Sequence, residues 1–111
     1  MGRMWIWLAV AIAAEVSGTV ALKLSEGFTR VVPSVVVVLG YGLAFYGLSQ
    51  ALARGLPLGV AYGTWAAAGV ALVAIIGAAF FGEGLTWVQI GGIALVIAGV
   101  LALELGAAER A

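Results

Sequence analysis

The sequence contains no cysteine and no histidine, and only 9% of its 111 residues are charged. The lack of both residue types excludes disulfides, thiol chemistry and a conventional zinc site. Five basic and five acidic residues give a net charge of +0 without any basic cluster, which argues against nucleic acid as a partner. We therefore expect no metal site, no cofactor and no nucleic-acid partner.

Hydrophobic residues make up 65% of the chain, and its mean hydropathy is +1.23. A soluble domain is nearer half apolar and a quarter charged, so the lipid bilayer must be the solvent. Each of four apolar runs is long enough to cross a hydrocarbon core of about 30 Å at about 1.5 Å per residue. The sequence predicts an all-α integral membrane protein whose residues 1–111 form one membrane domain, with transmembrane helices at about 4–22, 31–52, 58–81 and 87–105.

The start of the chain has a second interpretation. Arg3, the apolar stretch after it and the small residues at 11–13 resemble a signal peptide with its cleavage site. However, the apolar run continues through Leu22, and the stretch before the cleavage site is too short. We expect the first run to be a membrane span.

The basic residues barely distinguish the two sides of the membrane. Four spans place Arg3, Arg54 and Arg110 on one side, and Lys23 and Arg30 on the other. A single fixed topology normally shows a clear Lys/Arg excess on the cytoplasmic side. Weak insertion with the N-terminus inside and insertion in both orientations therefore stay open, and the second permits an antiparallel dimer.

Four helices of this size enclose little space, so we expect a second subunit. Small residues let helices approach closely and offer faces for such a contact. They recur every four residues on the third run and along one face of the fourth. We favour the fourth run for the dimer contact, where the face is Gly92, Val96 and Gly99; the third-run residues are Gly59, Gly63, Ala67 and Ala71.

One carboxylate, Glu15, lies near the bilayer midplane, about 16 Å into the first run. A charge at that depth costs at least a few kcal/mol, and such residues are retained mostly for proton or ion pathways. The alternative is a protonated structural carboxyl that is hydrogen-bonded to a neighbouring helix. No Lys or Arg lies within the spans, and Lys23 is near the membrane edge. Glu15 can therefore become neutral by binding a proton or a cation from outside.

Residues spaced three, four and seven positions from Glu15 share its helix face. This face is smooth and mostly small, and Gly18 leaves room beside the carboxylate. We expect the face to line a binding site; its members are Leu8, Ala11, Ile12, Gly18 and Thr19.

Aromatic residues inside the spans suggest an organic cation as the ligand. Trp65 lies about seven residues inside the third run with Tyr62 one turn before it, and the second run carries Tyr41 and Phe45. Aromatic faces attract organic cations, most strongly when desolvated. A buried tyrosine hydroxyl also needs a partner, for which we expect Glu15. The alternative is that these rings only pack the helices together.

Four stretches resemble those of a known family: Ala14–Val16, Lys23–Arg30, Ala61–Trp65 and Gly92–Val100. With the chain's size, four spans and lone buried carboxylate, they resemble the small multidrug resistance family of proton-coupled cation exporters. The resemblance covers nearly the whole chain.

This resemblance implies a transporter rather than an enzyme, in the inner membrane of a prokaryote. It implies an antiparallel homodimer whose two Glu15 carboxylates form one site, loaded in turn with protons or a cationic drug. It further implies that Tyr41, Tyr62 and Trp65 line the site and that the Gly92–Val100 face builds the dimer contact.

Other functions remain as alternatives. Guanidinium exporters of the family tend to have tryptophan three residues after the glutamate, where this chain has Gly18; the glycine favours a roomier site for broad-specificity drug export. One half of an obligate heterodimer is a further possibility. A non-transporting membrane assembly subunit, such as a rotor ring component, has no need for a tryptophan in mid-span.

Overall fold

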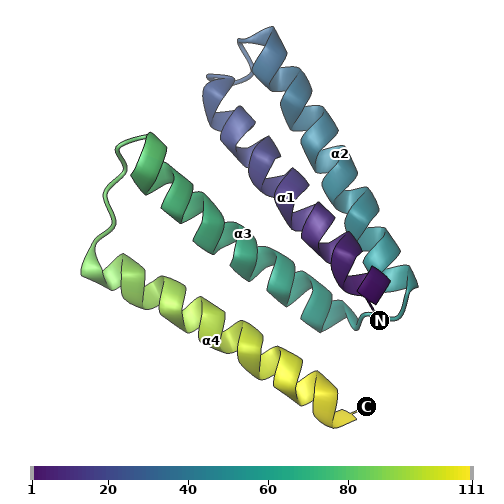
Figure 1. Ribbon diagram of the computed structural model, residues 1–111. Helices are drawn as coiled ribbons and strands as arrows, with labels where there is room; N and C mark the ends of the chain where they lie inside the picture. The colour runs from purple at the N-terminus through teal and green to yellow at the C-terminus, as the bar shows by residue number, and fades with distance from the viewer. Residues whose placement is uncertain (1, 111) are drawn as a thin grey trace. The chain divides into compact units, whose positions relative to one another are not determined.

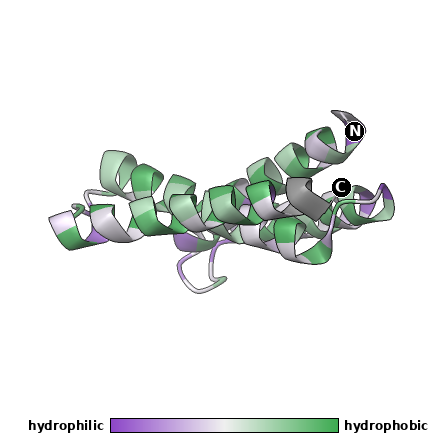
Figure 2. Cartoon of the chain, turned by 90° about the horizontal axis from the view of Figure 1, so that it is seen from below, coloured by the Kyte–Doolittle hydropathy of each residue, from purple (hydrophilic) through white to green (hydrophobic). Residues whose placement is uncertain are grey.

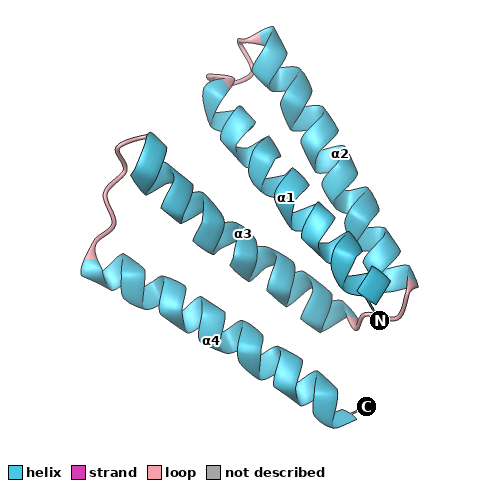
Figure 3. Cartoon of the chain, viewed as in Figure 1, coloured by secondary structure: helices cyan, strands magenta, loops and turns pink. Residues whose placement is uncertain are grey.

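The computed structural model describes the backbone of residues 2–110 and the side chains of residues 2–106. The described chain forms four helices and no strand (Figures 1 and 3). They are α1 (Gly2–Leu24), α2 (Val31–Ala53), α3 (Leu58–Phe80) and α4 (Trp87–Arg110). All four are long and apolar enough to cross a membrane, which confirms the prediction of a four-span, all-α protein.

The helices group into two compact units, Met1–Leu56 and Pro57–Ala111. Each unit is a pair of antiparallel helices joined by a short connection (Figure 1). The placement of all 111 residues in one membrane domain stays a prediction. α4 continues five residues beyond the predicted end at 105, so Glu104 lies more than one turn before the end of the helix.

The helical form follows from the solvent. A bilayer core offers no water to the backbone, so a spanning segment must satisfy its N–H and C=O groups internally. Figure 2 shows hydrophobic residues along all four helices and hydrophilic residues concentrated in the connections and at helix ends.

A tight turn joins α1 to α2. Ser25, which is fully buried, donates its hydroxyl to the Leu22 carbonyl at 2.7 Å and accepts the Phe28 N–H at 3.1 Å. Glu26 and Phe28 both have positive φ, of 49° and 67°, a conformation that non-glycine residues rarely adopt. The stretch Lys23–Arg30, noted in the sequence, is therefore an ordered turn that fixes where α2 begins.

Helix ends elsewhere follow familiar capping patterns. Gly55 and Gly82 have positive φ just after α2 and α3, as glycine commonly does at helix C-termini. At the start of α4, Thr86 Oγ1 accepts the Gln89 N–H at 3.2 Å, and Gln89 Oε1 accepts the Thr86 N–H at 2.8 Å. This reciprocal pair is a capping box, which satisfies two N–H groups that the helix leaves open.

Glycines on α2 allow it to approach α1 closely. A Cβ at Gly40 would lie 3.0 Å from the Ala14 carbonyl oxygen and 3.0 Å from the Gly18 Cα. A Cβ at Gly47 would lie 3.1 Å from the Trp7 carbonyl oxygen. The obstacles are backbone atoms, which cannot rotate away, so the two helices pack with almost no side chain between them at these points.

Gly40→Leu is expected to destabilise the chain by about 1–3 kcal/mol, because a side chain at this position forces the two helices apart. Thermal unfolding in detergent measures the effect. Gly42→Leu is the matched control, because nothing lies within 4 Å of a Cβ at Gly42. Equal effects of the two substitutions would contradict close packing at Gly40.

In the second unit, α4 contacts α3 through side chains. Gly63, predicted as part of a small-residue face, would place a Cβ 2.6 Å from Leu103 Cδ1, so the glycine makes room for α4. Gly59 of the same face has nothing within 4 Å of its Cβ position. Gly92 and Gly99, predicted for the dimer contact, are likewise open and exposed. Their role in a dimer stays a prediction.

Candidate functional site

Glu15 lies in the middle of α1 and is half-buried. Its Oε2 atom is buried and has no hydrogen-bond partner within the described part of the chain. Most buried polar atoms in proteins do have a partner, and one without a partner calls for an explanation, such as a missing ligand or ion. This unpaired oxygen marks Glu15 as the candidate site residue of α1.

The hydroxyls of Tyr41 and Thr19 lie 2.5 Å apart and join α2 to α1, one turn along α1 from Glu15. Thr19 Oγ1 also donates to the Glu15 carbonyl oxygen at 2.9 Å. A hydroxyl has one proton to give, so Tyr41 must be the donor to Thr19. The expectation that Glu15 is the partner of the tyrosine hydroxyl is wrong for Tyr41, since Thr19 lies nearer on the facing helix.

Gly18 packs against Tyr41. A Cβ at Gly18 would lie 3.4 Å from Cδ2 and Cε2 of the Tyr41 ring, which is ordinary contact distance. Within this unit, an alanine at this position would therefore fit beside the Tyr41 ring, one turn from Glu15.

The other members of the Glu15 face divide between buried and partly open positions. Leu8 is 1% exposed and Ala11 is fully buried, and Ala11 packs against the glycine surface of α2 at Gly47. Ile12 is half-buried, whereas Phe45 on α2 is 58% exposed. Ala11 therefore packs against α2, and the lining of a substrate site by these residues stays a prediction.

The aromatic pair on α3 is formed as the spacing predicted. The rings of Tyr62 and Trp65 are 5.7 Å apart between centroids, with an interplanar angle of 69°, in an edge-to-face arrangement. Trp65 is 8% exposed and Tyr62 is 58% exposed. The Tyr62 ring is therefore exposed, and the buried Trp65 ring packs against it.

Among the described residues, no group of three or more His, Cys, Asp or Glu side chains is placed to hold a metal ion.

Comparison with known proteins decides the family. The family described as Small Multidrug Resistance protein matches residues 3–96. The chain belongs to the small multidrug resistance family. It is 54% identical over 103 residues to the quaternary ammonium compound-resistance protein QacF of Klebsiella aerogenes, covering 93% of each chain. It is 46% identical over 101 residues to the multidrug resistance protein EbrA of Bacillus licheniformis, covering 91% of this chain and 95% of that one.

A third relative is the quaternary ammonium compound-resistance protein QacE of Escherichia coli, 45% identical over 101 residues and 91% of each chain. Family membership makes this protein a multidrug efflux transporter and not an enzyme. With its four spans, it is a multi-pass protein of the prokaryotic inner membrane.

The structure of this small multidrug resistance protein also shows a pair that the sequence did not reveal. Thr64, next to Trp65, donates its hydroxyl to Glu104 Oε1 of α4 at 3.3 Å. Glu104 is 40 positions from Thr64, on a different helix. Helical periodicity relates only residues of the same helix, so the sequence did not predict this pair.

The glycines of α2 were also missed, although a signal was present. Gly40, Ala44, Gly47 and Ala51 recur at spacings of four, three and four residues, and Ala44 and Ala51 are fully buried. That pattern predicts one small-residue face on a helix. In this transporter, the face packs against α1 through Gly40 and Gly47.

Loss of the Tyr41 hydroxyl in Tyr41→Phe is expected to destabilise the protein by about 0.5–1.5 kcal/mol, because the bond to Thr19 disappears. Thr19→Val removes the same bond from the other helix. The double variant is expected to be less destabilised than the sum of the two singles, since both remove one interaction. Denaturant unfolding of all four proteins measures this coupling, and strict additivity would show that the two hydroxyls act independently.

Proposed function

We propose that this transporter exports lipophilic and quaternary ammonium cations in exchange for protons, and that both ligands bind at Glu15. The buried Oε2 atom without a hydrogen-bond partner carries the proposal, because a proton or a cation would satisfy it. The relatives QacF and QacE, described as quaternary ammonium compound-resistance proteins, support this class of substrate.

Competition for one carboxylate is sufficient to couple the two flows. A quaternary ammonium ion has no N–H to donate, so it is attracted by charge and by aromatic faces rather than by hydrogen bonds. Only the ionised carboxylate attracts it, and cation binding therefore requires that the proton leave. Cation affinity should accordingly fall as the pH is lowered.

The proposed site includes further residues. Tyr41, Tyr62 and Trp65 supply aromatic surface, and Glu15 supplies the charge. The remaining members of the proposed lining are Leu8, Ala11, Ile12, Gly18, Thr19 and Phe45.

The proposed assembly is an antiparallel homodimer in which two inverted copies bring their Glu15 residues to one shared site. Exchange between two equivalent conformations then presents this site to either side of the membrane. The contact between the copies is assigned to Gly92, Val96 and Gly99 on α4. Nothing lies within 4 Å of a Cβ placed at Gly92 or Gly99, which leaves space for a closely packed partner helix.

Transport by the purified protein in proteoliposomes tests the proposal. With a pH gradient imposed, we expect uptake of tetraphenylphosphonium and none of guanidinium. Guanidinium uptake alone would favour the guanidinium-exporter alternative. Activity of this single chain supports a homodimer, whereas activity that needs a second, different chain would show an obligate heterodimer.

A further inference from the structure

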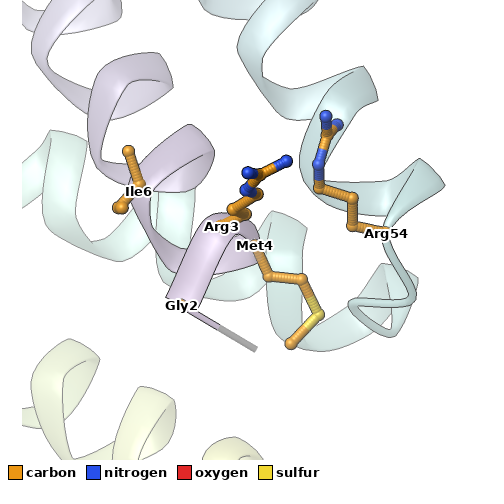
Figure 4. Close-up of a pocket in the computed structure, with 5 residues that line it drawn as sticks. All are labelled: Gly2, Arg3, Met4, Ile6 and Arg54. Carbon is orange, nitrogen blue, oxygen red and sulfur yellow. The ribbon is translucent and has the colours of Figure 1, made fainter.

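A pocket of about 560 Å³ lies where the start of α1 meets the end of α2. Two arginines line it: Arg3 belongs to α1, and Arg54 directly follows α2. Their side chains extend toward each other (Figure 4). The other lining residues are Gly2, Met4 and Ile6. The transport proposal uses none of these five residues.

Arg54 is held in place by its neighbours. Its guanidinium Cζ lies over the Trp7 ring, 5.6 Å from the centroid, in a cation–π contact. Its Nη1 donates to Gln50 Oε1 at 2.6 Å and to the Gln50 carbonyl oxygen at 3.3 Å. Trp7 is itself in edge-to-face contact with Tyr46, with ring centroids 5.6 Å apart. The guanidinium thus has a fixed position before any ligand arrives.

The lining of this pocket carries positive charge without compensation, because none of its described residues is acidic. Within Met1–Leu56 the acidic residues are Glu15 and Glu26. Glu15 lies twelve positions from Arg3 along α1, about 18 Å away at about 1.5 Å per residue. Glu26 follows the opposite end of the same helix. Two cations that share a pocket repel each other, and an anion between them would relieve this repulsion.

The depth of the pocket indicates which anion it meets. Gly2 begins α1 and Arg54 follows the end of α2, so both arginines lie at the membrane–water boundary. Trp5 and Trp7 lie in the first two turns of α1, at the level where indoles contact lipid headgroups. Phospholipid phosphates lie at this level, and the apolar Met4 and Ile6 side chains offer a wall for an acyl chain.

We propose that Arg3 and Arg54 bind the phosphate of an anionic phospholipid such as phosphatidylglycerol. The planar guanidinium donates two parallel hydrogen bonds to phosphate oxygens, and basic pockets between membrane helices bind anionic headgroups. The bound lipid joins the start of α1 to the end of α2. It also neutralises a positive region at one end of a transporter whose proposed substrates are cations.

Titration of the full chain with phosphatidylglycerol, followed by native mass spectrometry, tests this site. Each arginine near a membrane surface contributes about a fivefold increase in affinity for anionic lipid. The double variant that combines Arg3→Gln and Arg54→Gln is therefore expected to bind phosphatidylglycerol about 25-fold more weakly. The matched control is Lys23→Gln with Arg30→Gln, which removes the same charge at the other end of the first unit and should leave binding nearly unchanged. Phosphatidylcholine titrations should not distinguish the three proteins.

A single variant keeps the test valid if the double variant fails to fold. Arg3→Gln changes only the start of α1 and is expected to weaken phosphatidylglycerol binding about fivefold on its own. Equal losses in the two double variants would overturn the proposal in favour of diffuse surface charge. Phosphatidylcholine binding as tight as phosphatidylglycerol binding would also overturn it. Displacement of the lipid by millimolar inorganic phosphate would overturn the lipid as ligand and assign the site to free phosphate.

Discussion

Proteoliposomes that contain the Glu15→Gln variant are expected to show no proton-driven uptake of tetraphenylphosphonium above the rate of empty vesicles. Glutamine has nearly the same volume as glutamate, so the packing of α1 against α2 should remain. It neither releases a proton nor attracts a cation by charge. Uptake driven by an imposed pH gradient measures the effect.

Glu104→Gln is the matched control for this loss. It makes the same chemical change on α4, and the new amide oxygen can still accept the Thr64 hydroxyl. We expect this variant to transport at close to the unaltered rate. Accumulation of tetraphenylphosphonium by Glu15→Gln vesicles in response to the proton gradient would rule out Glu15 as the exchange group.

Trp65→Leu is expected to weaken the binding of tetraphenylphosphonium about tenfold. A desolvated cation–π interaction contributes about 2 kcal/mol or less, and leucine retains hydrophobic volume but no aromatic face. Loss of the ring also removes the edge-to-face partner of Tyr62. Equilibrium binding to the purified protein measures the change.

Two further variants separate aromatic character from bulk. Trp65→Phe retains a weaker aromatic face and should fall between the unaltered protein and Trp65→Leu. Trp87→Phe alters a tryptophan that is 86% exposed at the start of α4 and should leave binding unchanged. Unaltered affinity in Trp65→Leu would show that this ring only packs the helices.

The fold could be predicted because the solvent allows so few alternatives. Long apolar segments in lipid must be helical, and short connections make consecutive helices antiparallel. The end of α4 was less predictable. Hydropathy identifies where contact with lipid ends near 105, but Ala107, Ala108, Glu109 and Arg110 include good helix formers, and the helix continues through them.

The sequence predicts those parts of the candidate site that follow from position within a single membrane span. Glu15 could be identified because a carboxylate in mid-span is costly, and Tyr62 and Trp65 because they are one turn apart. The partner of Tyr41 depends on how α2 is rotated against α1, which Gly40 and Gly47 set by close contact. Spacing within one helix carries no information on such rotation. The bond between Thr19 and Tyr41 therefore appears only in the structure.

Proton release on cation binding tests the role of Glu15 most directly. Tetraphenylphosphonium is added to the purified protein in weakly buffered detergent solution, and the pH is followed with an indicator. The proposed exchange predicts that the solution acidifies as the cation binds, and that the Glu15→Gln variant gives no acidification. Saturable binding of the cation to the unaltered protein without any proton release would contradict it.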